Sequence, residues 1–350
     1  MALVMMLFGM FCWGSWPNTC KLARGWRFEL FYWDYAAGIF LTSILVGLTL
    51  GTFFGRQTFW QDLLAADGNA LIYAGMAGAL WNIGNILLVA GVSSVGLAVA
   101  FPVSIGMALA VGVVGSYLVA PRGNPVLLFV GVGLVCSAVV VNSLAHRSAV
   151  VAKQEISRSG IWVCLASGVF FSGFGPLLAK SLTAPHPVAP YGMGVLFTFG
   201  ALVTTVPLMT YFMRHPFSGK PVSVADYMRG TSGEHAAGLL GGFVWGLGTT
   251  FTFVPMTMVG TALAYAIGQS NPLVAALWGV FVWHEFRGAP KRSQVLLAVM
   301  FVLYIAGLLL LTISFRTTAR RDHQSAAGLQ IDSRRQSMLQ VPHPAARKII

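Results

Sequence analysis

Amide and indole side chains occur together in the middle of long apolar stretches of this sequence. Trp81, Asn82 and Asn85 lie within about one helical turn of one another, so a helix here would carry two amides beside an indole on one face. The indole offers a flat apolar surface, and the amides both donate and accept hydrogen bonds. The pattern predicts a site for a flat, neutral, hydrogen-bonding solute. The alternative is that both amides bond neighbouring helices.

A second polar group interrupts an apolar stretch near the end of the chain. Gln269, Ser270 and Asn271 come directly before Pro272. Proline removes a helical hydrogen bond and frees backbone carbonyl groups, which can then face a cavity. We therefore expect Gln269 and Asn271 to face the solute, with a simple helix kink as the alternative.

Two further stretches contribute residues of the same kinds. Trp13 and Trp16 are three positions apart and share a helical face near Asn18, while Trp245 and Thr249 are four apart on another stretch. The predicted solute-binding residues are Trp13, Trp16, Asn18, Trp81, Asn82, Asn85, Trp245, Thr249, Gln269 and Asn271.

Acidic side chains near the apolar stretches are few. Asp34 begins the second stretch and Glu285 ends the ninth. A carboxyl group at such a depth can bind and release a proton as a solute moves, so both are predicted coupling residues. The alternative is an interfacial ion pair, of Asp34 with Lys21 or Arg27 and of Glu285 with Arg287.

Several classes of function lack their sequence signals. The sequence has no Gly-x-x-x-x-Gly-Lys-[Ser/Thr] loop, so we expect gradients rather than nucleotide hydrolysis to supply the energy. The four cysteines form no Cys-x-x-Cys pair, and the apolar stretches hold no catalytic cluster of Asp, His or Ser. We expect no enzyme activity, cofactor or metal. The 22 Lys and Arg are scattered, which favours contact with anionic lipid over nucleic acid.

The elements that must position these residues are membrane-spanning helices. Hydrophobic residues make up 56% of the chain and charged residues 9%, far from a soluble composition. A helical span needs roughly 20 apolar residues. Ten such runs are predicted, namely Ala2–Trp16, Tyr35–Phe54, Ala70–Val92, Val95–Ala120, Pro125–Ala145, Ile161–Ala179, Pro190–Met213, Ala236–Met258, Thr261–Trp283 and Val295–Phe315.

The ten predicted helices form two related sets of five. Residues of helix one match helix six at an offset of 159, and residues of helices three and four match eight and nine at 164. The clearest pairs are Gly14 with Gly173, Pro17 with Pro176, Lys21 with Lys180, Trp81 with Trp245, Gly96 with Gly260, and Arg122-Gly123-Asn124-Pro125 with Arg287-Gly288-Ala289-Pro290.

Because five is odd, the second set must cross the membrane in the opposite sense to the first. Inverted repeats of this kind let two halves exchange conformations around a central site, which is alternating access. The predicted organisation is a first repeat over 1–145, a connecting loop over 146–159, a second repeat over 160–315 and a disordered basic tail over 316–350. This is an all-α polytopic membrane protein, and the symmetry points to a transporter. A sensor or scaffold would keep the repeat without needing a polar cavity.

The loop charges predict an orientation. Loops after odd-numbered helices hold 12 Lys and Arg, whereas those after even-numbered helices hold only Arg56, Arg122 and Lys180. The positive-inside rule places the first set in the cytoplasm and both termini outside, while the basic C-terminal tail argues the other way. We expect a multi-pass protein of the plasma membrane.

Short motifs in this order resemble the plant-type ureide permeases of the drug/metabolite transporter superfamily. Gly14-Ser15-Trp16-Pro17 is similar to that family's Gly-Thr-Trp-Pro, Tyr32-Trp33-Asp34-Tyr35 to its Tyr-Leu-Asp-Tyr, and Ile83-Gly84-Asn85 to its Leu-Gly-Asn. Further matches are Gly96-Leu97, Pro272-Leu273-Val274, Trp278-Gly279 and Glu285-x-Arg287. The order of these motifs extends over about 270 residues.

The resemblance implies ten helices in two inverted halves and uptake of neutral nitrogen-rich heterocycles such as allantoin and uracil, with protons as the coupling ion. One departure is that plant members carry a long hydrophilic loop between the halves, where this chain has only about His146 to Ser159. Regulation through that loop is therefore not expected. Sugar transporters of the same superfamily share the Trp-Gly-Ser of Trp13 to Ser15, so a rhamnose or glucose carrier is the alternative.

Overall fold

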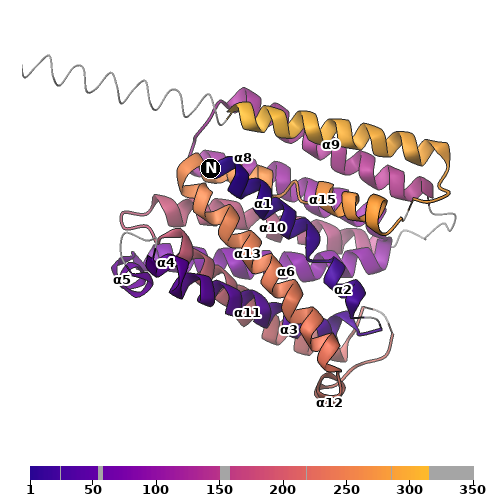
Figure 1. The fold of residues 1–350 in the computed structure, drawn as a ribbon, viewed down its shortest axis with the longest axis horizontal. Coiled ribbons are helices and arrows are strands. Elements are labelled where there is room, and N and C mark those ends of the chain that lie inside the picture. The colour runs from indigo at the N-terminus through magenta and orange to yellow at the C-terminus, as the bar shows by residue number, and fades with distance from the viewer. Residues whose placement is uncertain (24, 54–57, 150–157, 218, 285, 315–350) are drawn as a thin grey trace, which may run out of the picture.

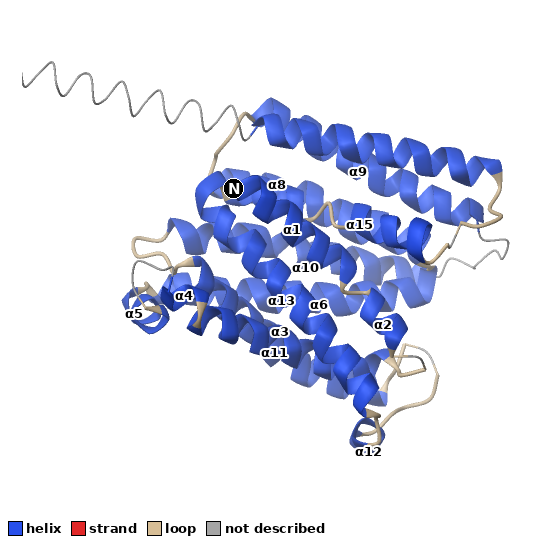
Figure 2. Ribbon diagram, in the orientation of Figure 1, coloured by secondary structure: helices blue, strands red, loops and turns tan. Residues whose placement is uncertain are grey.

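The fold is a bundle of helices. The computed structural model describes residues 1–23, 25–53, 58–149, 158–217, 219–284 and 286–314, and these residues contain no strand (Figure 2). Inside hydrocarbon a chain must satisfy its backbone hydrogen bonds internally, which a helix does. The chain is an all-α polytopic membrane protein, as its composition predicts.

Eight helices in the described part of the chain are long and apolar enough to cross a membrane. They are α3 with α4 (Phe28–Leu48 and Leu50–Phe53), α6 (Gly68–Val95), α7 to α8 (Leu97–Phe101, the π-helical η1 Pro102–Gly106 and Met107–Val119), α9 (Pro125–Ala149), α10 (Arg158–Thr183), α11 (Pro190–Arg214), α13 (Ser232–Val259) and the last helix Lys291–Ser314. The last helix runs beside α9 along one edge of the bundle (Figure 1).

The other two predicted spans are short or interrupted helices. The first is α1 (Ala2–Ser15), followed by α2 (Asn18–Leu22), and the second consists of α14 (Thr261–Gly268), α15 (Pro272–Leu277) and η2 (Trp278–Val282). The helix predicted over Thr261–Trp283 is thus interrupted directly before Pro272, where the sequence left a solute-facing site or a simple kink open. These interrupted helices touch, because a Cβ on Gly14 would lie 2.5 Å from the Asn271 carbonyl oxygen. The structure is compatible with ten spans, two of them interrupted.

Some helices begin or end at residues other than those that the sequence predicts. The second predicted helix begins at Phe28 rather than Tyr35, because Arg27 pairs with Glu29 at 2.8 Å and so allows that carboxylate to be buried within the helix. Asp34 therefore lies inside a helix and not at its start. Residues 146–149 of the predicted connecting loop continue α9, and 158–159 begin α10. Glu285 and the predicted tail 316–350 lie outside the described residues.

Matched positions of the two predicted repeats adopt the same backbone conformation. Gly96 ends α6 with φ 76° and ψ 161°, and Gly260 ends α13 with φ 93° and ψ 153°. Glycine adopts a positive φ at little cost, so α6 and α13 end for the same local reason, a glycine directly after the helix. The glycines of the two Arg-Gly-x-Pro turns, Gly123 and Gly288, also have positive φ.

The helix crossings repeat as well. A Cβ on Gly38 of α3 would lie 2.6 Å from the Leu239 carbonyl oxygen of α13, and a Cβ on Gly200 of α11 would overlap the Gly75 carbonyl oxygen of α6. The two crossings are related by offsets of 162 and 164. The short helices α5 (Phe59–Ala65) and α12 (Val224–Met228), which precede α6 and α13, lie at opposite ends of the bundle (Figure 1). This arrangement is compatible with two halves of opposite sense.

Candidate solute-binding site

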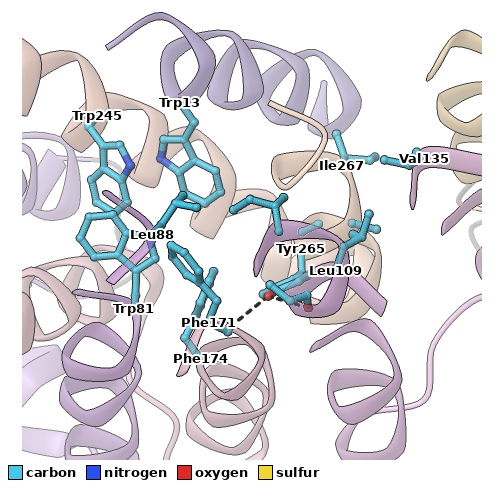
Figure 3. Packing of buried hydrophobic residues seen from close by; sticks show 14 of the residues in the cluster. Trp13, Trp81, Leu88, Leu109, Val135, Phe171, Phe174, Trp245, Tyr265 and Ile267 are labelled. Atoms are coloured by element: carbon cyan, nitrogen blue, oxygen red, sulfur yellow. Dashed lines mark hydrogen bonds between the residues drawn. The ribbon is translucent and has the colours of Figure 1, made fainter. Parts of the chain in front are cut away.

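Three indole rings from three helices meet in the centre of the bundle. Trp13 of α1 stacks on Trp245 of α13 with ring centroids 5.6 Å apart and an interplanar angle of 16°. The ring centroids of Trp81 on α6 and Trp245 are 4.1 Å apart, and Figure 3 shows Trp13 beside Trp245 with Trp81 below Trp245. The structure thus brings together the three central tryptophans that the sequence predicts.

Glycines and one threonine hold Trp13 in place. A Cβ on Gly248 would lie 2.6 Å from Cδ1 of the indole, and a Cβ on Gly268 would lie 2.7 Å from Cζ3. The Trp13 Nε1–H donates to Thr249 Oγ1 at 3.3 Å, and the Thr249 hydroxyl donates to the Trp245 carbonyl oxygen at 3.1 Å. Thr249 therefore orients the indole pair and is itself 1% exposed.

An inner cavity of about 110 Å³ borders this cluster. Its polar lining comes from Asn85, Gln269 and Asn271, which are predicted site residues. Its aromatic lining includes Trp16, whose ring stacks on Tyr35 with centroids 4.3 Å apart. The full lining consists of Trp13, Gly14, Trp16, Pro17, Trp81, Asn85, Leu88, Phe101, Ile105, Phe171, Phe174, Trp245, Gln269, Asn271 and Ala275.

The two amides of α6 have different environments. Asn82 is 1% exposed, accepts a hydrogen bond from the Tyr32 hydroxyl at 2.7 Å, and donates to Thr204 and Thr205 at 3.0 and 3.1 Å. These contacts join α3, α6 and α11, which is the interhelical role that the sequence left open as the alternative. Asn85 donates to the Tyr32 hydroxyl at 2.9 Å and also lines the inner cavity.

The break between α14 and α15 places two amides at the cavity. Gln269 is 5% exposed, and Asn271 donates to the Gly268 carbonyl oxygen at 3.1 Å. Discontinuous helices at the centre of a membrane bundle expose backbone and side-chain polar groups to a bound solute. The break therefore supplies hydrogen-bonding groups where an unbroken apolar helix would offer none.

An outer cavity of about 200 Å³ continues from the inner one and shares Gly14, Pro17, Phe101 and Ala275 with it. It extends to Asn18 and to the exposed side chains of Lys21 and Trp283. The Trp283 Nε1–H donates to Asn18 Oδ1 at 2.5 Å, and the Lys21 Nζ lies 4.3 Å from the centre of the Trp283 ring. Asn18 thus lines the outer cavity, and not the inner cavity that Trp13, Trp81 and Trp245 border.

Tyr265 of α14 lies behind the wall of the inner cavity, where its ring packs on that of Phe174 with centroids 4.8 Å apart. This side chain is 1% exposed, and a Cβ on Gly112 or Gly175 would lie 2.6 Å from its ring or hydroxyl. Its hydroxyl lies 3.1 Å from the carbonyl oxygens of both Ala108 and Phe171, to which it donates (Figure 3). The sequence prediction missed Tyr265, and the only signal was its match to Phe101 at the repeat offset of 164.

The predicted coupling residue Asp34 is buried, with 6% of its surface exposed. Its carboxylate accepts hydrogen bonds from the Tyr227 hydroxyl at 2.7 Å and from His235 Nδ1 at 2.8 Å. The structure thus pairs Asp34 with Tyr227 and His235, where the sequence offered Lys21 or Arg27 as the alternative partners. Neither His235 nor Tyr227 was predicted, because each lies beyond an apolar stretch in the sequence and far from Asp34.

Comparison with known proteins identifies the family. Residues 31–159 and 158–314 match the family model described as ureide permease. The chain belongs to the ureide permease family. The predicted resemblance is confirmed, and with it a multi-pass transporter of small molecules.

Individual relatives of this ureide permease family member share a low sequence identity with it, but over most of the chain. Ureide permease 1 of Arabidopsis thaliana is 23% identical over 89% of this chain and 96% of its own length. A putative sugar uptake protein of Lactiplantibacillus plantarum is 24% identical over 74% of this chain and 86% of its own length. A solved crystal structure of a protein 16% identical aligns over 90% of the chain with a TM-score of 0.60, which supports the fold.

Proposed function

We propose that this member of the ureide permease family is a secondary active transporter of the plasma membrane that takes up small, neutral, nitrogen-rich heterocycles together with protons. Allantoin and uracil represent this class of solute. The observation that carries the proposal is the inner cavity. Its lining combines the indoles of Trp13, Trp81 and Trp245 with the amides of Asn85, Gln269 and Asn271.

The chemistry of the cavity matches such a solute. An indole face stacks on a flat ring, while Asn85, Gln269 and Asn271 offer both donors and acceptors to ring N–H and C=O groups. The residues that line the inner cavity include no charged side chain, so an ionic solute would lose its hydration without gaining a partner. The cavity therefore favours neutral solutes with several hydrogen-bonding groups.

The two cavities and the packing of Tyr265 support alternating access. The cavities lead to the end of the bundle that carries Lys21 and Trp283, and we infer that Tyr265, packed behind Phe174, closes the other end. Under the orientation predicted from the loop charges, the Lys21 end faces the cytoplasm. This form of the transporter is then open inward, and an outward-open form arises when the two halves exchange conformations.

A sugar carrier is the second candidate. The likeness to a putative sugar uptake protein over 74% of the chain favours it. Aromatic faces and amides also suit a sugar ring, which is neutral and rich in hydroxyl groups. The two candidates differ in what they offer to the amides of Asn85, Gln269 and Asn271: a heterocycle offers ring N–H and C=O groups, whereas a sugar offers hydroxyl groups.

Uptake by the purified protein in liposomes tests the proposal. Radiolabelled allantoin, uracil, glucose and rhamnose are compared with and without an inwardly directed proton gradient. We expect the heterocycles to accumulate, and their accumulation to require the gradient. Accumulation of the sugars alone would establish the second candidate, and transport of none of the four would contradict both.

A further inference from the structure

A histidine, a carboxylate and a tyrosine form a closed cluster outside the solute cavity. The carboxylate of Asp34 on α3 accepts from the Tyr227 hydroxyl of α12 through Oδ1 and from His235 Nδ1 of α13 through Oδ2. With Nδ1–H committed to the carboxylate, the other ring nitrogen of His235, Nε2, is the atom left to bind a proton. The cluster thus joins the two halves of the molecule through one titratable ring.

The surroundings of the cluster are shaped to hold it. A Cβ on Gly238 would lie 2.6 Å from the Cβ of Asp34, so only a glycine lets α13 approach this closely. A Cβ on Gly230 would lie 2.7 Å from His235 Nε2. The indole of Trp26 meets the imidazole edge-on, with centroids 4.8 Å apart. The His235 side chain keeps 27% of its surface exposed, which gives water access to the ring.

The charged groups around His235 are engaged elsewhere. Glu234 caps its own helix through Thr231, and on α12 Asp226 caps Ser223 and pairs with Arg229 at 3.8 Å. At the start of α3, Glu29 pairs with Arg27. Burial raises the pKa of Tyr227 to about 12, and its hydrogen bond to Asp34 acts in the same direction. Tyr227 therefore remains a hydrogen-bond donor at neutral pH, which leaves His235 Nε2 as the atom of the cluster that can accept a proton.

The other half of the molecule lacks this cluster. At the repeat offsets of 162 and 164, Asp34 corresponds to Leu196, Tyr227 to Leu63 and His235 to Leu71. These three leucines are apolar side chains packed against the core. A purely structural contact would be expected in both halves, so the polar version at one end indicates a specialised task.

One rigid helix connects the cluster to the solute site. Tyr35 follows Asp34 on α3 and stacks on Trp16 of the inner cavity. Tyr32 lies on the same helix and bonds both Asn82 and Asn85. A shift of α3 relative to α13 would therefore move two groups that contact the lining of the inner cavity.

We propose that His235, held by Asp34 and Tyr227, is the proton-binding site that couples the proton gradient to solute accumulation. The inference rests on the proposed transport function and names the coupling site for it. One proton from water binds Nε2 and forms an imidazolium paired with the Asp34 carboxylate. The same proton leaves to water on the other side after the conformational change, so no bond other than this N–H forms or breaks.

The charge of the cluster explains why proton binding controls the conformational change. Without the proton, the imidazole and carboxylate carry a net charge of one negative unit, which must stay near water. With the proton, the pair is neutral overall and is less costly to transfer into a drier environment. The halves can then rearrange around α3 and α13, and the solute moves with the proton.

The double variant Asp34→Asn/His235→Gln in proteoliposomes tests the proposal, with labelled uracil and allantoin as probes. It removes both the proton site and the negative charge, so the cluster stays neutral and needs no proton for the conformational change. We expect gradient-driven accumulation to fall about tenfold, the size of an ordinary coupling between two ligands, while exchange without a gradient stays within about twofold. The exchange rate should also lose its pH dependence. His215→Gln, an exposed histidine beside Tyr211, is the matched control and should behave as the wild type.

The outcomes separate this inference from the proposed function. Full accumulation by the double variant, or equal loss of its accumulation and exchange, would overturn the coupling role. Failure of the wild type to exchange either probe would count against the proposed function instead. In that case NMR of the histidine rings in detergent still tests the proton site, because Asp34→Asn should displace the titration of the signal that is missing from His235→Gln. An unchanged titration would overturn the inference.

Discussion

Tyr265 and Phe101 occupy matched positions of the two predicted repeats, 164 residues apart, but their rings differ in their surroundings. Tyr265 is enclosed between α8 and α10, and its hydroxyl donates to the carbonyl oxygens of Ala108 and Phe171. Phe101 borders both the inner and the outer cavity at the other end of the site. An exchange of conformations between the halves would open the Tyr265 end and close the Phe101 end.

The first prediction is that Tyr265 closes the inner cavity at the end away from Lys21. Tyr265→Ala should then leave the inner cavity open at both ends for part of the time. We expect accumulation of a labelled solute in liposomes to fall severalfold while its passive leak rises, because solute escapes through the open end. The leak is measured as efflux from preloaded liposomes without a gradient.

Tyr265→Phe is the control for the seal. It keeps the ring between Gly112 and Gly175 and loses only the hydroxyl, which costs about 1 kcal/mol. Its leak should remain close to that of the wild type. Equal leaks from Tyr265→Ala and the wild type would mean that another part of the molecule closes this end.

The second prediction separates the two amides of α6. Asn85→Ala should weaken solute binding with little change in thermal stability, because Asn85 lines the inner cavity. Asn82→Ala should lower stability by about 1–3 kcal/mol, because Tyr32, Thr204 and Thr205 lose a shared partner. Solute-induced quenching of tryptophan fluorescence measures binding, and melting in detergent measures stability.

A reversed result would contradict this division. If Asn82→Ala weakened binding while its melting temperature stayed unchanged, Asn82 would have to contact the solute directly. If Asn85→Ala melted early without any effect on binding, its bond to Tyr32 would be its main role.

Residue type alone predicts much of the site, because polar groups and tryptophans are rare enough in apolar helices to stand out. Trp81, Asn85 and Trp245 were found in this way, and the structure places them around one cavity. Tyr265 and Phe101 were missed because one aromatic among many on an apolar run carries no signal by itself. Only the repeat offset relates them, and only the structure shows that one is sealed and the other borders a cavity.

The cluster of Asp34, Tyr227 and His235 shows a different limit of sequence reasoning. Asp34 was predicted as a coupling residue because acidic residues are rare near the apolar stretches, but its expected partners were the charged residues close to it in sequence. The actual partners, Tyr227 and His235, are about 200 positions away and reach Asp34 because Gly238 brings α13 against α3. Pairings at such separations depend on the tertiary packing of helices, which periodicity within one segment does not encode.

The third prediction tests the helix crossings. A Cβ on Gly78 would overlap the Phe197 carbonyl oxygen, so Gly78→Ala should force α6 and α11 apart and cost about 1–3 kcal/mol. Gly133→Ala on α9 is the matched control, because nothing lies within 4 Å of its Cβ position. The control should be neutral or slightly stabilising, since alanine favours a helix more than glycine does. Melting temperatures in detergent compare the two, and equal losses would contradict the close crossing.

The last prediction concerns Asp62 of α5, which accepts hydrogen bonds from the Ala189 backbone N–H at 3.0 and 3.2 Å. Burial raises the pKa of Asp62 above its usual value of 3.8, and the bond from Ala189 opposes the shift only in part. The folded state therefore holds this proton more tightly than the unfolded state does. Its contribution to stability is present at low pH and is lost as pH rises through the raised value.

Asp62→Asn removes this dependence while keeping an acceptor for Ala189. Because Asp62 is partly exposed, solvent screening limits the effect to about 0.5 kcal/mol or less. Melting of the wild type and of Asp62→Asn is compared at pH 4 to 7, a range chosen to begin near the ordinary Asp value. The difference between the two proteins should grow in favour of asparagine as pH rises. A difference that grows in favour of aspartate would mean that the charged carboxylate stabilises the link between α5 and α11.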